Sequence, residues 1–423
     1  MTHFGIICPP GAGHLNPMTA IGHELRQRSH RVTIFTIPDG ERTTLTAGLE
    51  FRAIGEQEFP RGAHAEFFAQ LGKMSGLAGL RYTINRYEKG TAVFLRDAPP
   101  AMKEAGVEAV LVDQTHSEGE TIAAFLDIPF ITVCNALVLN REPDIPPFCT
   151  PWFYSSAWWA RLRNRIIYSL VDRAGKTIKE TIKHYRLSWK LPPYSHIAQY
   201  YSQLAQLSQQ PPEFEFPRHH LPNCFHFTGP YSNSTIREPT PFPWEKLTGK
   251  PLIYASMGTI HNRFFWVFRD IASACAELDV QLVISLGNSA GEESLSEWAG
   301  NPLVVRYAPQ LELLQKATLT ITHSGLNTTL ESLSNGVPMV AIPMTYDHPA
   351  IGARIVWTGT GEVVPLGKVS RETLREAERQ VLTEDSYKKN ARSLQEAIKR
   401  AGGVSRAADI IEKVVATGKP VMR

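Results

Sequence analysis

Residues 4–39, FGIICPPGAGHLNPMTAIGHELRQRSHRVTIFTIPD, contain the pattern that predicts the fold of this chain. A short apolar run ends at two prolines, a glycine turn follows, and apolar residues then recur at helical spacing from Leu15 to Leu25. A second apolar run begins after Arg31, so the segment predicts a strand, a turn, a helix and another strand. Because buried strands that alternate with helices form parallel sheets, this order indicates a doubly wound α/β fold.

The same alternation of strands and helices recurs in two separate parts of the chain. VEAVLVD at 107–113 and IPFITVCNA at 128–136 flank a predicted helix at 118–126. After residue 251 the alternation restarts with PLIYASMGT, VQLVISLG, TLTITHSG and PMVAIPM, separated by helical segments. The sequence therefore predicts two Rossmann-like, doubly wound parallel-sheet domains.

Two segments break this alternation. Residues 141–221 are rich in proline and aromatic side chains, and no strand is predicted there. The polar segment that follows has the Pro, Ser, Thr and Gly content of a linker, and the last helical stretch is amphipathic. The predicted organisation is a first domain at 1–227, a linker at 228–250, a second domain at 251–402 and a C-terminal helix at 403–423 that can pack back on the first domain.

Composition and charge describe an ordinary globular chain of 423 residues, long enough for two or three domains. Lys and Arg number 44 against 41 Asp and Glu, a net charge of +3, so bulk charge does not indicate a nucleic-acid partner. Five cysteines form no CxxC pair, which argues against a disulfide framework or a zinc site. We expect a reducing cytoplasm, because the sequence shows neither a signal peptide nor an apolar run of about 18 residues.

The glycine turn GAGH at 11–14 partly matches a dinucleotide-binding fingerprint. In a GxGxxG motif, Asp39 after the second strand would be the acid that binds the ribose of NAD. Asn16 and Pro17 stand where the third glycine should be, so the match is weak. An NAD-dependent dehydrogenase is therefore kept only as an alternative.

His14 and Asp113 are the first candidates for chemistry. His14 follows the first predicted strand and precedes a helix, where open α/β sheets bind ligands, and an imidazole there can accept a proton. Asp113 ends another strand of the same sheet, so the two side chains can meet, and an aspartate that accepts from a histidine N–H fixes its tautomer. A capping histidine and a turn aspartate are the simpler explanations, and both stay open.

Polar side chains also gather at the strand ends of the second domain. They are His323, Ser324 and Gly325 after a predicted strand, and Asn327, Thr328 and Thr329 in the first turn of the next helix. Short donors at a helix N-terminus suit an anion such as a phosphate, and Thr259 can add a hydroxyl. Glu331 is placed to accept from ribose hydroxyls, and Tyr307 offers a flat face for a base. Each residue alone can be a cap or a core residue, but together they indicate a nucleotide site.

With these motifs the chain resembles the inverting UDP-sugar glycosyltransferases of the GT-B type, which have two Rossmann-like domains. The resemblance covers nearly the whole chain, and its most specific parts are YAPQ at 307–310, HSGLNTTLESLSNGVP at 323–338 and PMTYDH at 343–348. At finer grain, VDQ at 112–114 and LNREPDIPP at 139–147 look like the bacterial zeaxanthin glucosyltransferases.

The resemblance implies a role for each matching residue. His14 would deprotonate the acceptor hydroxyl with Asp113 as its partner. The implied donor-binding residues are Thr259, Tyr307, Ala308, Gln310, His323, Ser324, Gly325, Asn327, Thr328, Glu331, Asp347 and His348. A UDP-sugar would be the co-substrate, and neither a cofactor nor a metal is expected. Tyr307 replaces the usual tryptophan, and His348 replaces the usual glutamine, which leaves the donor sugar open.

The implied reaction moves a hexose, with glucose as the first candidate, from a UDP-sugar to a hydroxyl of an apolar small molecule with inversion. A hydroxylated carotenoid such as zeaxanthin is the expected acceptor, and flavonoid, sterol or macrolide-like acceptors are alternatives. A nucleotide-sugar epimerase and a non-catalytic carotenoid-binding protein are the alternatives of other classes.

An aromatic segment at 152–159, followed by three arginines, has three readings. It can wall an apolar acceptor pocket, lie on an anionic membrane surface as a peripheral contact, or pack in the core.

Overall fold

The computed structural model describes residues 1–74, 76–258, 265–287 and 298–423, and within them it contains two parallel sheets. The first sheet has seven strands in the order β3-β2-β1-β4-β5-β6-β7. These strands are β1 (His3–Ile7), β2 (Arg31–Thr36), β3 (Glu50–Ala53), β4 (Ala109–Asp113), β5 (Phe130–Cys134), β6 (Gln206–Ser208) and β7 (Phe225–Phe227). Their apolar residues are almost fully buried between helices, as expected for a parallel sheet covered on both faces.

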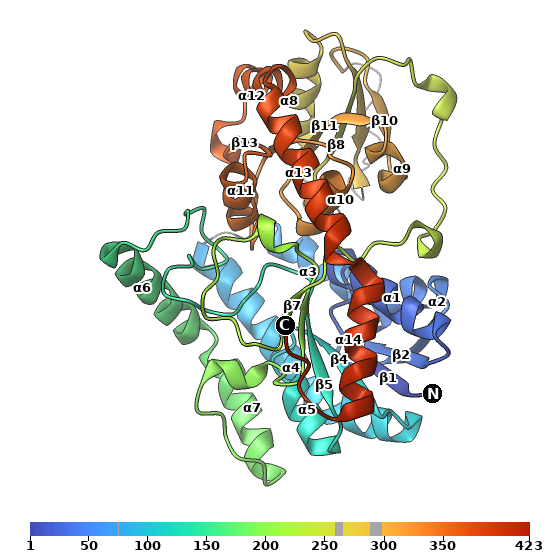
Figure 1. Cartoon of the computed structure of the whole chain (residues 1–423), viewed down its shortest axis with the longest axis vertical. Coiled ribbons are helices and arrows are strands. Elements are labelled where there is room, and N and C mark those ends of the chain that lie inside the picture. The colour runs from blue at the N-terminus through green and yellow to red at the C-terminus, as the bar shows by residue number, and fades with distance from the viewer. Residues whose placement is uncertain (75, 259–264, 288–297) are drawn as a thin grey trace.

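The second sheet has six strands in the order β10-β9-β8-β11-β12-β13. They are β8 (Leu252–Ser256), β9 (Gln281–Ser285), β10 (Leu303–Val305), β11 (Ala317–Thr322), β12 (Met339–Ala341) and β13 (Gly361–Val363). Every pairing in both sheets is parallel, so the predicted pair of doubly wound α/β domains is confirmed (Figure 1).

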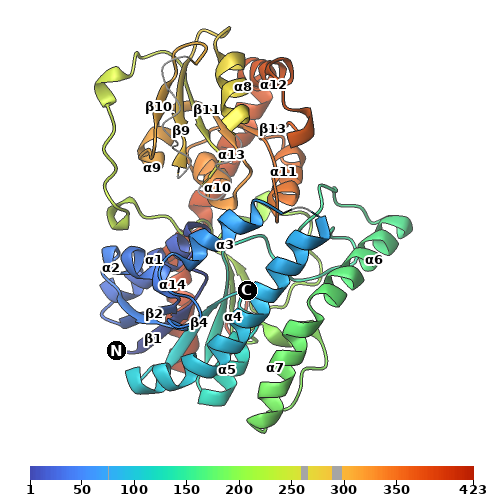
Figure 2. The ribbon, with the colours of Figure 1, turned by 180° about the vertical axis from the view of Figure 1, so that it is seen from behind.

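Helices cover the faces of both sheets (Figures 1 and 2). In the first domain they are α1 (Ala12–Gln27), α2 (Glu41–Thr46), α3 (Ala63–Leu71), α4 (Gly76–Ala105), α5 (Gly119–Leu126), α6 (Trp158–Ala174) and α7 (Lys176–Ser188). In the second they are α8 (Phe265–Cys275), α9 (Gln310–Leu314), α10 (Leu326–Ser334), α11 (His348–Trp357), α12 (Arg371–Thr383) and α13 (Asp385–Ala401). Of these described helices, none combines the length and apolar character that crossing a bilayer requires.

The expectation that 141–221 contains no strand is wrong, because β6 lies within it. The strand is only three residues long, too short for periodicity to reveal. Its polar Gln206 is buried because its side-chain oxygen accepts a hydrogen bond from Asn140 at 3.0 Å and its nitrogen donates to Ser202 O at 2.9 Å. Polar residues in a covered strand are thus satisfied by side-chain contacts that sequence alone does not show.

The last helix, α14 (Gly403–Thr417), packs against α1 of the first domain, while α13 belongs to the second (Figure 1). Gly402, at φ 91°, separates the two helices in a left-handed conformation that favours glycine. On the α14 side, Glu412 accepts from Arg28 Nη1 at 2.7 Å and lies 3.0 Å from His30 Nε2. The chain therefore crosses from one domain to the other at Gly402.

Glu378 on α12 makes stability depend on pH. Its carboxyl is fully buried, and burial raises its pKa to about 8, with Cys275 Sγ at 3.5 Å as a weak partner. Between pH 4.5, the ordinary pKa of this carboxyl, and pH 8, the carboxyl is ionised in the unfolded chain but not in the folded one. The free energy of unfolding therefore falls as pH rises, by about 1.4 kcal/mol per pH unit. We expect Glu378→Gln to remove this slope in urea unfolding between pH 5 and 8. The exposed Glu376→Gln on the same helix should leave the slope unchanged, and equal slopes in both variants would contradict the assignment.

Candidate active site

His14 and Asp113, predicted to act together, are in direct contact. Asp113 ends β4, which pairs with β1, and His14 lies in the first turn of α1 rather than before the helix as expected. His14 Nδ1 and Asp113 Oδ2 are 2.8 Å apart. Asp113 also accepts hydrogen bonds from the Thr115 backbone N–H at 2.9 Å and from Asn135 Nδ2 at 2.7 Å. The buried carboxylate is thus fixed by several donors and directed at one imidazole nitrogen.

The electrostatics of the pair favour a charged imidazole beside a carboxylate. Burial alone would raise the pKa of Asp113, but the charge and hydrogen bond of His14, with those of its other donors, lower it well below its usual range. Burial works against a charged His14, yet the charge and hydrogen bond of Asp113 and the charge of Asp347 raise its pKa. His14 can therefore hold a proton more readily than an isolated imidazole.

Asp347 brings the second domain to this pair. It precedes α11, and its Oδ2 accepts a hydrogen bond from the backbone N–H of Leu137 in the first domain at 3.5 Å. Burial raises the pKa of Asp347, and the charge of His14 opposes that rise. The candidate site therefore lies between the two domains.

A second contact joins the two domains close to this pair. Pro17 lies inside α1 and has no N–H to donate to Gly13 O, its partner four residues earlier. The freed Gly13 carbonyl accepts from Asn327 Nδ2 at 3.1 Å, and Asn327 Oδ1 accepts from Gln209 Nε2 at 2.9 Å. The proline that weakens the NAD fingerprint thus supplies an acceptor for the second domain.

The His323 imidazole is held in a narrow space at the end of β11. A Cβ added at Gly258 would lie 2.6 Å from its Nε2, and one added at Gly325 would lie 2.5 Å from the same atom. Gly258 also has φ 73°, so glycine is required there by both conformation and space. The ring of His348 meets that of His323 edge to face, with centroids 4.7 Å apart. His348, the departure from the family pattern, therefore packs directly on a predicted donor-binding residue.

The N-terminus of α10 carries short polar side chains, as predicted. Gly325 precedes the helix, and Ser324 adopts φ 68°, a conformation that costs energy for a residue with a side chain. The hydroxyls of Ser324 and Thr329 are buried and have no hydrogen-bond partner among the described residues. Thr328, also buried, accepts from Gln310 Nε2 at 3.4 Å. Strain and unpaired hydroxyls beside a helix N-terminus are features that an anion would stabilise.

Glu331 is already engaged by protein groups. Gln310 Nε2 donates to its Oε2 at 2.5 Å, and Arg237 of the predicted linker forms an ion pair with its Oε1. Gln310 in turn accepts from the Tyr254 hydroxyl at 3.1 Å. Arg237 was not among the predicted site residues, because nothing in the sequence distinguishes it from Lys246 and Lys250 in the same polar segment.

The remaining predicted donor residues lie near this network or outside the described part of the chain. Tyr307 is 42% exposed between β10 and α9, and the guanidinium of Arg306 lies 5.9 Å from its ring centroid. Ala308 packs against the apolar cluster that includes Tyr254. Thr259 lies outside the described residues. Tyr307 therefore lies at the surface of the second domain, next to α9.

Next to the His14–Asp113 pair lies a cavity of about 100 Å³ that sequence reasoning did not anticipate. It is bounded at one end by Thr115, which also holds Asp113. Its aromatic lining comes from α3, α4 and the loop before them, with Phe59, Phe67, Phe68, Tyr87 and Phe94. None of its lining residues belongs to 152–159. The aromatic part of this lining therefore comes from residues 59–94, whose aromatic side chains were the available signal, and Cys8, Pro9, Pro10 and Ile37 add apolar surface.

Comparison with known proteins places the chain in a family. The family model of UDP-glucoronosyl and UDP-glucosyl transferases matches residues 80–401, and that of the glycosyltransferase family 28 N-terminal domain matches residues 11–94. Zeaxanthin glucosyltransferase of Pantoea ananas is 33% identical over 100% of this chain and 98% of that protein. Zeaxanthin glucosyltransferase of Pseudescherichia vulneris is 30% identical over 100% of both chains.

Solved structures share the arrangement of the two domains. The glycotransferase of kitacinnamycin has a TM-score of 0.76 and 21% identity, covering 97% of this chain and 98% of that one. The glycosyltransferase VinC in complex with dTDP has a TM-score of 0.70 and 16% identity, covering 98% and 100%. The two parallel-sheet domains therefore have the GT-B arrangement. Together with the family match and the full-length relatives, this shows that the chain belongs to the UDP-glucoronosyl and UDP-glucosyl transferase family and is a glycosyltransferase.

Proposed function

We propose that this glycosyltransferase moves glucose from UDP-glucose to a hydroxyl of a hydroxylated carotenoid such as zeaxanthin, with inversion. The observation that carries the proposal is the contact between His14 and Asp113 beside a cavity lined by aromatic side chains. The cavity, of about 100 Å³, takes an apolar part of such an acceptor, and Thr115 in its lining donates to Asp113, which brings the proposed base close to it. The relatives from Pantoea ananas and Pseudescherichia vulneris, both named for zeaxanthin, support this acceptor.

In the proposed reaction His14 is the general base. As the acceptor oxygen attacks the anomeric carbon, its proton passes to His14 Nε2, while Nδ1–H donates to Asp113. The new carbon–oxygen bond forms on one face of the sugar as the bond to UDP breaks on the other, and UDP leaves with the electron pair. An α-linked donor then gives a β-glycoside. No step draws on a metal ion, so we expect transfer to persist in EDTA.

The second domain would hold the donor. The diphosphate would lie against His323 and the N-terminus of α10, where Ser324 and Thr329 carry unpaired hydroxyls. The positive end of the helix dipole would stabilise the negative charge of the leaving UDP. Tyr307 would stack on the base. Glu331 would bind the ribose with its two existing partners as neighbours. Asp347 and His348 would face the sugar. Because His348 replaces the usual glutamine at this position, the family pattern does not fix the donor sugar, and glucose is part of the proposal.

Product analysis tests this function. Purified protein is incubated with UDP-glucose, UDP-galactose or dTDP-sugars, each against a hydroxylated carotenoid, a sterol and a flavonoid. We expect a carotenoid β-glucoside from UDP-glucose, identified by mass and by the anomeric coupling constant in NMR. Exclusive glucosylation of the sterol or flavonoid would overturn the acceptor, and an α-product would overturn inversion. UDP-glucose converted to another UDP-hexose without acceptor would indicate an epimerase.

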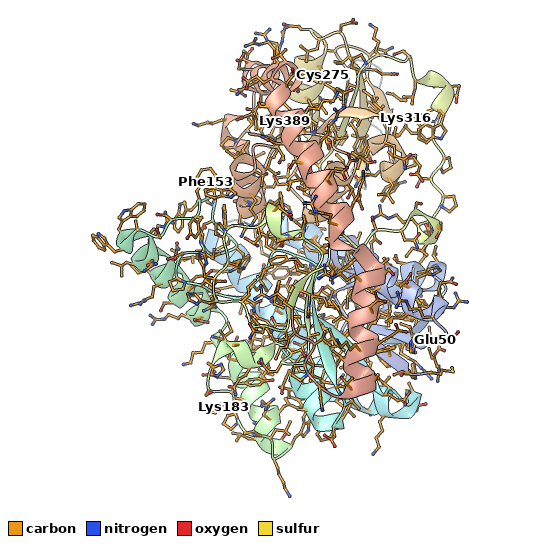
Figure 3. The ribbon with its side chains drawn as sticks, viewed as in Figure 1. Glu50, Phe153, Lys183, Cys275, Lys316 and Lys389 are labelled. Carbon is orange, nitrogen blue, oxygen red and sulfur yellow. The ribbon has the colours of Figure 1, made fainter. Side chains whose placement is uncertain are left out.

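A carotenoid acceptor dissolves in lipid, and α6 offers a surface for reaching it. Trp158, Leu162, Ile166 and Leu170 recur every four residues on this helix, and each is about half exposed or more. The helix projects from the body of the first domain in Figures 1 and 2, and Figure 3 labels Phe153 in the loop that precedes it. An exposed apolar stripe on a projecting helix is typical of a segment that lies in a membrane interface.

Basic side chains accompany the stripe. Arg165 and Arg173 on α6 and Lys183 on α7 have no carboxylate within 4.0 Å among the described residues, whereas Arg161 is paired with Asp144. Unpaired cations on α6 and on the helix that follows it complement an anionic lipid surface. We therefore propose that α6 docks on the anionic inner face of a membrane, with the enzyme in the cytoplasm, rather than forming the acceptor pocket.

Vesicle co-sedimentation tests this docking. We expect the wild type to bind phosphatidylcholine vesicles better when they contain phosphatidylglycerol, and Trp158→Ser/Trp159→Ser to lower binding about tenfold or more, because two interfacial rings are lost. Trp244→Ser, a 39% exposed tryptophan in the linker, is the matched control. Unchanged binding in the double variant would contradict docking through α6.

A further inference from the structure

A second cavity, of about 610 Å³, lies where the two domains and the C-terminal helices meet. Its walls come from the segment between β6 and β7, from the ends of α11 and α13, from α14 and from Arg423. None of the residues assigned above to the acceptor or the donor lines it. The cavity is therefore separate from the candidate active site, and both domains contribute to it.

The walls of this cavity carry four arginines: Arg218, Arg400, Arg406 and Arg423. Two carboxylates also line it, but both have partners: Glu213 pairs with Arg400 at 3.1 Å, and Glu215 accepts from Arg354 Nε at 2.9 Å.

Arg406 and Arg423 are the uncompensated charges. Arg406 Nη1 donates to Ala401 O at 3.3 Å, and Arg423 Nη2 donates to Leu221 O at 3.3 Å. No Asp or Glu carboxylate of the described residues forms an ion pair within 4.0 Å with either guanidinium, whereas Arg237, Arg354 and Arg400 are each paired with a glutamate. The charges of both arginines also help to lower the pKa of His226 in the same wall, after the larger effect of burial.

Arg218 gives the cavity a fixed, buried cation. Its side chain is 3% exposed, and its two Nη atoms donate to Asn140 O at 2.9 Å and Val138 O at 3.1 Å. Its Nε is fully buried and has no hydrogen-bond partner among the described residues, with the nearest Glu215 oxygen at 4.0 Å. Glu142 Oε1 lies 3.6 Å from Arg218 Nη1, so this guanidinium already has a carboxylate partner and fixes one wall of the cavity.

The other part of the lining is apolar and partly flat. Phe216, Phe227 and Trp357 line the cavity together with two prolines and two alanines. Trp357 is 45% exposed and meets Phe216 edge to face, with ring centroids 5.4 Å apart. An exposed indole fixed by a second ring can stack on a planar group. The lining thus combines a cationic part with an aromatic part.

We propose that this cavity binds a small phosphate-bearing molecule with a planar ring, of the nucleotide class, separately from the sugar donor. Guanidinium groups bind phosphate oxygens in pairs of hydrogen bonds, and the cavity volume exceeds that needed for phosphate alone. Arg406 on α14 and Arg423 lie on the side of the first domain, whereas Trp357 ends α11 of the second domain. A molecule whose phosphate contacts these arginines and whose ring stacks on Trp357 therefore contacts both domains and stabilises one relative position of them.

Calorimetry tests the cavity with two probes, ATP and inorganic pyrophosphate, and the variants below leave the proposed donor site intact, so a change in their binding reports on the cavity. We expect ATP to bind more tightly than pyrophosphate and to raise the melting temperature. Arg406→Ala/Arg423→Ala, at two exposed positions, should weaken the binding of both probes about tenfold or more, since two charged contacts are lost. Trp357→Ser should weaken ATP alone. Arg81→Ala, an exposed arginine on α4, is the matched control and should change neither.

Each other outcome overturns the proposal. Absence of ATP binding at millimolar concentration, or equal binding by the double variant, removes the site. Equal affinity for ATP and pyrophosphate removes the aromatic part and leaves an inorganic phosphate site. Tight binding only of vesicles containing phosphatidic acid, and of neither soluble probe, would assign the arginines to a lipid headgroup. Because binding is measured without an acceptor, failure here is independent of the proposed glucosyl transfer.

Discussion

Replacing His14 by alanine should lower the rate of sugar transfer by about 10²- to 10⁴-fold while leaving UDP affinity nearly unchanged. The proposed base belongs to α1 of the first domain, and the proposed diphosphate site surrounds His323 and α10 of the second. The substitution removes the acceptor of the hydroxyl proton but none of the groups that would contact UDP. Initial rates with saturating UDP-glucose and calorimetric titration with UDP measure the two effects separately.

The pH profile of a second variant distinguishes a base from a structural histidine. Asp113 raises the pKa of His14 by its charge and hydrogen bond, against the effect of burial. A base must be unprotonated, so transfer should decline as pH falls through the pKa of His14. In Asp113→Asn that decline should move to lower pH, because the charge that favours the imidazolium is gone, and the maximal rate should also fall. A wild-type rate in His14→Ala, or an unmoved profile in Asp113→Asn, would contradict the role of the pair.

The sequence allowed this pair to be predicted because the two residues follow the ends of parallel strands. Once 4–39 and 107–113 are recognised as βα units, the carboxyl ends of their strands lie at one edge of a sheet, and β1 and β4 are neighbours. Side chains at that edge are within reach of each other without knowledge of loop structure. The position of His14 inside α1, not before it, could not be predicted, because Pro17 suggested a later helix start.

Contacts between distant, irregular segments could not be predicted. Arg237 reaches Glu331 across 94 positions from a segment with no periodicity, and nothing in either neighbourhood specifies the pairing. The aromatic cavity beside His14 likewise depends on how α3 and α4 pack, not on a motif. The aromatic residues at 152–159 attracted the functional interpretation because they are dense in sequence. A cluster of aromatic residues in the sequence can form an exposed surface or part of the core, and only the packing of the fold decides between the two.

The relation between His323 and its neighbours was partly predictable. The motif HSG places glycine after the histidine, but the reason emerges only in three dimensions, where Gly258 and Gly325 lie on the ring from different strand ends. His348 was recognised as unusual from the family pattern, and the structure adds that its ring packs on His323. A substitution at His348 therefore acts on the donor site through His323 as well as through any contact with the sugar.

The second large effect concerns Arg354, which joins the domains through a buried ion pair. Arg354 on α11 donates from Nε to Glu215 Oε1 at 2.9 Å, in the segment between β6 and β7, and its guanidinium lies 4.3 Å from the ring centroid of Phe216. Arg354 and Glu215 are almost fully buried. We expect Arg354→Met to destabilise the protein by about 3–5 kcal/mol, because it leaves a buried carboxylate without its partner. Urea unfolding followed by far-ultraviolet circular dichroism measures the loss.

The double variant Arg354→Met/Glu215→Leu separates an unpaired charge from lost packing. If the cost is the buried charge, removing both partners should recover most of the stability, since a well-packed apolar pair is often as stable as a buried ion pair. The pH dependence gives a second criterion. Burial would raise the pKa of Glu215, but the charges of Arg354 and Arg218 lower it, so this pair's stabilising contribution exists above the unfolded pKa near 4.5 and is lost as pH falls below it. In Arg354→Met the pKa of Glu215 should rise instead, so the single variant should lose stability as pH rises from 5 to 8 relative to the wild type. A single variant that is destabilised equally at both pH values would show that Arg354 acts through its contact with Phe216 and not through the charge of Glu215.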